Sequence, residues 1–209
     1  LLLTEWAPTV SLGRSQSYAL DVDEAACRRY GVKIIRRRSG GQAVYIDEGY
    51  AAFSAIAPSS VFGSDLTQMR NGFCSIMVEA LQKMNVPAEF YPPDNVVINE
   101  RMYRTLGNSG QIIRPGTAVI QGSIRHRMVD IDVMLDVLKV NGHKLNNYGK
   151  EIHSILADVD AYNSIMKKED IQHAFINTFL EKTRSNSVEG MLMHKELEKV
   201  KAYLVEEQD

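Results

Sequence analysis

The sequence predicts a mixed α/β fold in which amphipathic helices lie on a sheet of short strands. Short apolar runs bounded by turn residues, such as residues 50–57, predict strands. Between residues 65 and 84, apolar side chains recur at steps of three and four, which predicts a long amphipathic helix. With 209 residues, of which 44% are hydrophobic and 24% charged, the chain can bury a core. We expect a single domain, 1–209, with 1–140 as its core and 141–209 as its C-terminal helical portion.

The composition excludes several classes of protein. A formal net charge of −2 gives no general basic surface for a nucleic acid or a membrane. No apolar run approaches the roughly 18 residues that span a bilayer, and no secretory signal is recognised at the start. Cys27 and Cys74 are too few for a disulfide framework, which indicates a reduced cytoplasmic compartment, and both are expected to be packing residues. The five histidines include no pair at metal-ligand spacing, so we expect no structural zinc.

The first elements lead into a central motif. Residues 1–12 predict a strand that is interrupted at Pro8, because proline removes a donor from the strand ladder. A turn at 13–16 follows. The composition of residues 21–30 predicts a helix, and Gly31 is its expected C-terminal stop.

The chain is organised around residues 36–49. Three consecutive cations, Arg36 to Arg38, precede a Ser-Gly-Gly turn and a short strand. Adjacent glycines let backbone N–H groups approach a ligand closely, and arginine recognises anionic oxygens with a bidentate, permanently charged group. This combination favours a phosphate or carboxylate site. Gly-Gly is also a common hairpin turn, so a β-hairpin with a solvated basic face is an equal alternative on spacing alone.

The elements after this motif follow from the same patterns. The run at 50–57 ends in a polar turn at 58–60, and the helix at 65–84 is expected to fill the core with its methionines. The later expected elements are a turn at 91–95, a strand at 96–98, a hairpin of 112–113 with 118–124 around Pro115 and Gly116, a helix at 130–138, a polar linker at 141–150, and helices at 168–184 and 194–205.

Residues 36–49 spell Arg-Arg-x-Ser-Gly-Gly-x-Ala-Val-Tyr-x-Asp-x-Gly. This pattern resembles the signature of the lipoate–protein ligase family, within the wider biotin/lipoate ligase and octanoyltransferase superfamily. Gln42 stands where that signature has a third glycine, and Ile46 stands where it usually has a histidine. The segment 6–16 resembles the family's Trp-x-Pro-x-Val-Ser-Leu-Gly-Arg-x-Gln. Family members usually carry a helical segment before it, so we expect an absent or separately encoded N-terminal portion.

The resemblance covers nearly the whole chain and implies a mixed, largely antiparallel sheet flanked by helices. It implies that Arg36, Arg37 and the Ser-Gly-Gly turn bind a phosphate or the acyl carboxyl end, and that residues 43–45 border an acyl tunnel. The full set of implied substrate- and nucleotide-binding residues is Arg14, Gln16, Arg36, Arg37, Ser39, Gly40, Gly41, Gln42, Ala43, Val44, Tyr45, Asp47, Asn95, Gly107 and Ser109.

One family residue has no counterpart. The family places a lysine shortly before Ser-Gly-x-Ala-Gln, where a cation stabilises charge on the α-phosphate and then on the acyl carbonyl oxygen. Gly122-Ser123-Ile124 resembles the Gly-Ser-Ile that follows this loop in the family. Counting back from it without gaps puts Thr105 at the lysine position and Arg104 beside it, and no lysine lies between residues 83 and 139. We expect Arg104, with Thr105, to be catalytic. The alternative is that Arg101 and Arg104 are exposed loop cations.

The leading function implied is a ligase that activates lipoate or octanoate with ATP and Mg²⁺ to acyl-AMP. The acyl group would then pass to a lysine of a lipoyl carrier domain, either like the glycine cleavage H protein or like the E2 component of 2-oxoacid dehydrogenases. Asp94, in an Asp-Asn pair that reverses the family's order, is the implied Mg²⁺ ligand. The alternatives are an ATP-independent octanoyl or lipoyl transferase, and a non-catalytic acyl-binding partner subunit. A separate accessory domain or subunit is a further possible partner.

Overall fold

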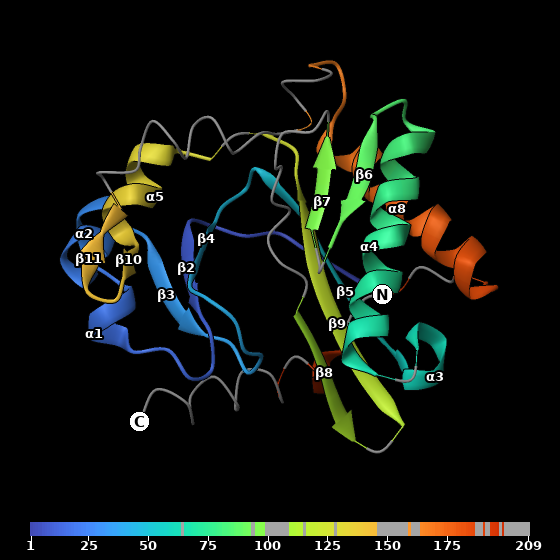
Figure 1. Cartoon of the computed structure of the whole chain (residues 1–209), viewed down its shortest axis with the longest axis horizontal. Coiled ribbons are helices and arrows are strands. Elements are labelled where there is room, and N and C mark those ends of the chain that lie inside the picture. Colours follow the sequence, from blue (N-terminus) through green and yellow to red (C-terminus); the bar gives the residue numbers. More distant parts are fainter. Residues whose placement is uncertain are drawn as a thin grey trace.

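The computed structural model describes residues 1–63, 65–92, 95–98, 109–114, 116–127, 129–145, 159, 164–186, 190, 193–196 and 198. A four-stranded antiparallel sheet lies in the middle of the molecule (Figure 1). Its strands, in spatial order, are β1 (Leu2–Thr4), β5 (Tyr50–Pro58), β9 (Thr117–Arg125) and β8 (Ser109–Arg114). The predicted strand at 50–57 and the hairpin around Gly116 are confirmed, and Gly116 adopts a positive φ of 82° in the turn.

Two long helices cover one face of this sheet (Figure 1). They are α4 (Leu66–Lys83) and α8 (Lys168–Thr183), and both were predicted. The Asp65 side chain caps α4 by accepting from two backbone N–H groups of its first turn. Phe53 of β5 stacks on Phe175 of α8 with ring centroids 4.0 Å apart, and Cys74 lies fully buried in the same core.

A short helix, α3 (Ser59–Phe62), connects β5 to α4 where the sequence predicted a polar turn. A hairpin of β6 (Ala88–Tyr91) and β7 (Asn95–Ile98) packs against α4. Strand β7 corresponds to the predicted strand, whereas β6 was not predicted.

A second sheet of three strands stands beside the first (Figure 1). Its order is β3 (Lys33–Arg36), β2 (Thr9–Leu12) and β4 (Val44–Ile46). Strand β2 is parallel to β3 and antiparallel to β4. A second hydrophobic cluster joins this sheet to the helices α2 (Glu24–Tyr30) and α5 (Ile131–Val137), and Cys27 is buried within it.

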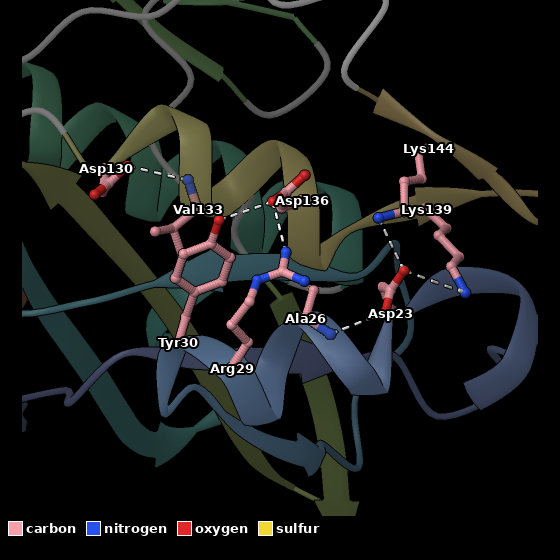
Figure 2. Close-up of polar contacts among 9 residues, drawn as sticks. All are labelled: Asp23, Ala26, Arg29, Tyr30, Asp130, Val133, Asp136, Lys139 and Lys144. Carbon is pink, nitrogen blue, oxygen red and sulfur yellow. Dashed lines mark hydrogen bonds and ion pairs between the residues drawn. The ribbon is translucent and has the colours of Figure 1, made fainter.

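Polar contacts tie α2 to α5 and to the hairpin that follows, β10 (Lys139–Val140) with β11 (His143–Lys144) (Figure 2). Arg29 Nη2 and Tyr30 Oη both donate to Asp136 Oδ2 at 2.8 Å. Asp23 Oδ1 accepts from Ala26 N at 2.9 Å and so caps α2, while Asp23 Oδ2 lies 3.1 Å from Lys144 Nζ. These contacts join α2 to α5 and to the β10–β11 hairpin.

Several predicted boundaries were wrong. The strand predicted at 1–12 is two strands in different sheets, because β1 pairs with β5 while β2 pairs with β3 and β4. The helix predicted at 21–30 begins only at Glu24, since Val22 is extended and bridges to Leu138; a separate helical turn, α1 (Tyr18–Asp21), precedes it. The predicted linker at 141–150 starts with the turn and second strand of the β10–β11 hairpin.

Of the other predictions about the fold, some are confirmed and one falls mostly outside the described residues. The mixed α/β fold with largely antiparallel strand pairing is confirmed, and so is the helix that begins after Asp130. The helix predicted at 194–205 falls mostly outside the described residues. In the part of the chain that the structure describes, no helix has both the length and the apolar character that crossing a membrane requires.

Candidate functional site

The predicted anion site is the loop of residues 37–43, which runs from β3 to β4. Strand β3 ends beside Leu12, and β4 begins beside Ser11 on the other side of β2. The loop therefore passes across the C-terminal end of β2. The alternative of a simple β-hairpin is wrong, because β3 and β4 pair with β2 and not with each other.

Two arginines of the motif hold this loop and the preceding turn in shape. Arg37 Nη1 donates to the carbonyl oxygen of Ser11 at 2.6 Å, and Arg37 Nη2 donates to those of Gly40 and Gln42 at 2.9 and 2.7 Å. Arg36 Nη1 donates to the carbonyl oxygens of three residues in the turn, Gly13, Arg14 and Gln16. Both guanidinium groups thus organise backbone in addition to any ligand contact that they make. Burial lowers the pKa of Arg37.

The loop and the turn at 13–16 are packed directly together. Arg14 N donates to the carbonyl oxygen of Ser39 at 3.0 Å. A Cβ atom placed on Gly13 would lie 2.0 Å from the carbonyl oxygen of Gly41, so only glycine fits there. Gly41 has a positive φ of 98°, which also favours glycine. The two segments form one structural unit.

Arg14 supplies a cation at this unit that no described residue neutralises. Its side chain is exposed and makes no hydrogen bond or ion pair with the described residues. The backbone on both sides of it is fixed by Arg36 and Ser39. A free guanidinium on an ordered backbone is suited to bind a phosphate or carboxylate.

Three buried polar atoms outside the helices have no hydrogen-bond partner among the described residues. They are Ser39 Oγ in the loop, Ser123 Oγ on β9 and Trp6 Nε1 between β1 and β2. Because buried polar groups are almost always hydrogen-bonded, such atoms mark places where a ligand or water supplies the partner. A fourth atom of this kind, Thr178 Oγ1, lies in α8 away from these three.

The strand register places Ser123 on the side of the central sheet that α4 and α8 do not cover. Ser123 pairs with Ala52, and Ala52 pairs with Thr4. The neighbouring residue Phe53 points to the opposite face, into the core beneath α4 and α8. The side chains on this second face are buried as well, since Ala52 is 5% and Ser123 is 3% exposed. Trp6, two residues after Thr4, packs against the second hydrophobic cluster.

Neither Ser123 nor Trp6 was predicted from the sequence to bind a ligand. Both belong to segments that resemble the family, but a sequence pattern does not distinguish a polar group without a partner from one that is hydrogen-bonded. Ser54 and Gln121 lie on the same face, where Gln121 Nε2 donates to Ser54 Oγ at 3.1 Å. Ser109, a predicted binding residue, begins β8 opposite Gln121 in the register.

The remaining motif residues are less exposed to solvent than Arg14 and Gln42. Tyr45 and Ile46 are buried in the second hydrophobic cluster, whereas Ala43 and Val44 are half-buried at the end of the loop. Burial raises the pKa of Tyr45 well above its usual value. Asp47 Oδ1 accepts from Gly49 N at 2.9 Å, and burial raises the pKa of this carboxyl. Asp47 therefore also has a role in the turn before β5.

Other predicted site residues are not brought to this unit or lie outside the described residues. Asn95 begins β7, beside Tyr91 in the hairpin that packs on α4. Among the residues that the structure describes, no group of three His, Cys, Asp or Glu side chains could hold a metal ion. The predicted residues outside the described ranges are Asp94, Arg104, Thr105 and Gly107.

Comparison with known families agrees with this geometry. A model described as the lipoyl protein ligase A/B catalytic domain matches residues 1–182. The chain belongs to this family. Lipoate-protein ligase LplJ of Bacillus subtilis is 25% identical over 201 residues, which are 92% of this chain and 57% of LplJ. Lipoate–protein ligase 1 of Staphylococcus aureus is 24% identical over 183 residues, which cover 84% of this chain and 52% of that protein. The chain thus spans little more than half the length of these relatives.

Solved structures of lipoyl ligases share the fold. A bi-partite lipoate protein ligase from Thermoplasma acidophilum, studied with its E2 lipoyl domain, superposes with a TM-score of 0.84 at 24% identity. That match covers 94% of this chain and 75% of the other. A lipoate-protein ligase A bound with ATP gives a TM-score of 0.74 at 22% identity, covering 92% and 75% of the two chains. The lipoyl ligase fold is therefore the fold of this chain.

Proposed function

We propose that this chain is the catalytic part of a lipoate–protein ligase that forms acyl-AMP from lipoate or octanoate and ATP. The observation that carries the proposal is the unit of the 13–16 turn and the 37–43 loop. Neither the Arg14 guanidinium nor the buried Ser39 hydroxyl has a partner among the described residues, and Gly13 packs closely on Gly41. These groups fit an anionic ligand better than a neutral one.

In the first step, a carboxylate oxygen of the acid attacks the α-phosphorus of ATP, a P–O bond forms, and pyrophosphate leaves with the electron pair of the broken bond. Negative charge builds on the α-phosphate, and Arg14 is the described residue whose charge is available to offset it. Arg104 is proposed as the second cation. Mg²⁺ would enter with the ATP phosphates, and Asp94 is the proposed ligand for it.

In the second step, the ε-amino group of a carrier lysine attacks the acyl carbon, the amine loses a proton, and AMP leaves. The acyl chain is proposed to lie along the face of the central sheet opposite α4 and α8. Ser123 Oγ on that face offers a polar contact beside the small side chain of Ala52. Holding the anhydride against this face would shield it from water until the amine arrives.

The carrier is proposed to be a lipoyl domain like that of the H protein or of an E2 component. Support comes from the Thermoplasma ligase that was studied with its E2 lipoyl domain. That ligase is bi-partite, and the present chain covers only 57% of LplJ. A second polypeptide or domain is accordingly part of the proposal.

A transferase that carries the acyl group on a cysteine is less well supported. Cys27 and Cys74 are both buried, and burial raises the pKa of the Cys27 thiol to about 11. Neither sulfur is presented as a nucleophile, since the thiolate is the reactive form.

Mass spectrometry of a lipoyl carrier domain tests the proposal. The carrier is incubated with this protein, lipoate or octanoate, ATP and Mg²⁺, and parallel reactions omit ATP or use Arg14→Ala or Arg104→Ala protein. An ATP-dependent gain of one acyl group that is weakened in both variants supports the ligase. A gain without ATP would instead identify a transferase. If no gain occurs, and adding an accessory subunit from a bi-partite ligase does not restore it, the ligase proposal is wrong.

A further inference from the structure

Gln16 and Gln42 form a side-chain contact across the unit just described. Gln16 Nε2 donates to Gln42 Oε1 at 3.3 Å, joining the 13–16 turn to the 37–43 loop across 26 residues of sequence. Gln42 stands where the family signature has a third glycine, and a glycine could not make this contact. The contact is therefore a feature of this chain.

The orientation of both amides follows from the surrounding donors. Gln16 Oε1 accepts from Gly13 N at 3.0 Å, so the oxygen of this amide must face Gly13. Its NH₂ group then faces Gln42, which must present its own oxygen in return. The Gln16 amide thereby links the start of its own turn to the opposite loop.

The Gln42 side chain adds to a backbone that is already fixed. Arg37 Nη2 holds the carbonyl oxygen of Gln42 at 2.7 Å, whichever side chain is present. Gln42 also has no positive φ, so alanine can replace it without backbone strain. Removing the Gln42 side chain therefore removes the contact to Gln16 without releasing the loop backbone.

The segment that gains from this contact is the turn that carries Arg14. Its other direct links to the loop are the bond from Arg14 N to the Ser39 carbonyl oxygen and the packing of Gly13 on Gly41. Arg14 and Gln42 are exposed, so water competes for the turn's contacts. Each added link reduces the positions that the Arg14 guanidinium samples before a ligand binds.

We propose that the Gln16–Gln42 contact is a brace that pre-organises Arg14 for the anionic substrate, which makes Gln42 a positioning residue. The expected effect of the brace on KM rests on the proposed ligase function, whereas its expected effect on hydrogen exchange in the free protein does not. The brace acts together with Arg36, which already binds three carbonyl oxygens of the turn. A brace that acts before binding strengthens ground-state and transition-state binding equally. Its loss therefore raises KM and leaves kcat nearly unchanged.

Hydrogen exchange in the free protein tests the brace independently of activity. The Arg14 amide, which is bonded to Ser39, should lose protection about three- to tenfold in Gln42→Ala, the range that one net hydrogen bond corresponds to. Gln42→Glu keeps an acceptor for Gln16 and should retain the protection. Ser15→Ala is the matched control, because Ser15 is exposed in the same turn and its side chain makes no hydrogen bond with the described residues.

Kinetics with lipoate, ATP and a lipoyl carrier domain then test the consequence. Gln42→Ala should raise KM for lipoate or ATP about three- to tenfold with kcat within twofold of the unaltered protein, while Ser15→Ala changes neither. Unchanged exchange at Arg14 in Gln42→Ala would overturn the brace, as would an equal loss in Ser15→Ala. An unaltered protein that does not ligate at all would refute the proposed function, and the exchange result would still decide the brace.

Discussion

Replacing Gly13 by alanine tests the packing that joins the turn to the loop. The added Cβ would lie 2.0 Å from the carbonyl oxygen of Gly41 and 3.0 Å from its carbonyl carbon. One of the two segments must therefore move by about 1 Å or more, and overpacking of this kind costs about 1–3 kcal/mol of unfolding free energy. Because Gly41 and Ser39 move with the loop, we also expect weaker binding of lipoate and ATP.

Gly40→Ala is the matched control for stability, since an added Cβ there has no atom within 4 Å. Urea denaturation should give Gly13→Ala a lower unfolding free energy and Gly40→Ala a change within about 0.5 kcal/mol of zero. Thermal unfolding should shift down by about 2–4 °C per kcal/mol for a chain of this size. Equal stability of the two variants would refute the argument, because the close contact would then cost nothing.

Three further outcomes follow from other contacts. Arg37→Lys should lose about 1.5–3 kcal/mol of unfolding free energy, because an ammonium cannot span the three carbonyl oxygens that Arg37 binds; retention of stability in urea would contradict this. Asp23→Ala should cost about 1 kcal/mol at pH 7 through loss of the cap on α2 (Figure 2). The hydrogen bond from Ala26 N, followed by Lys144, lowers the pKa of Asp23 below its usual value of 3.8, so its stabilisation is present above pH 3.8 and lost as the pH falls through the folded pKa; a difference between wild type and variant that does not shrink as the pH falls below 3.8 would argue against it. A thiol reagent at pH 8 should label Cys27 and Cys74 only in denaturant, since a pKa of about 11 leaves about 0.1% of Cys27 as thiolate and both are buried; rapid labelling of the folded protein would disprove this.

Local patterns predicted much of the secondary structure. The helix after Asp65 and the helix after Asp130 were found because the apolar period and the capping residue both lie within one segment. The 1–12 region failed because extended residues on both sides of Pro8 give the same local signal whether they join one sheet or two. Which strands pair depends on contacts between residues that are far apart in the chain, and a local stretch of sequence does not contain both partners.

The site was predicted in the same uneven way. The motif at 36–49 predicted an anion site, because arginine and glycine carry their charge and conformational freedom wherever they are placed. It did not reveal that Arg36 and Arg37 bind carbonyl oxygens while Arg14 remains available. Ser123 was not predicted as a binding residue, because whether a buried hydroxyl has a hydrogen-bond partner depends on its neighbours in the folded structure.

The sequence by itself determined the kinds of element, the family signature and its two departures at Gln42 and Ile46. Only the tertiary structure decided that the signature loop crosses the end of β2, that Gly13 touches Gly41, and that Gln42 meets Gln16. The physical reason is the separation in sequence over which each kind of interaction acts. Propensity, capping and charge act within a few residues, whereas hydrogen-bond satisfaction and close packing depend on which distant segments the folded chain brings together.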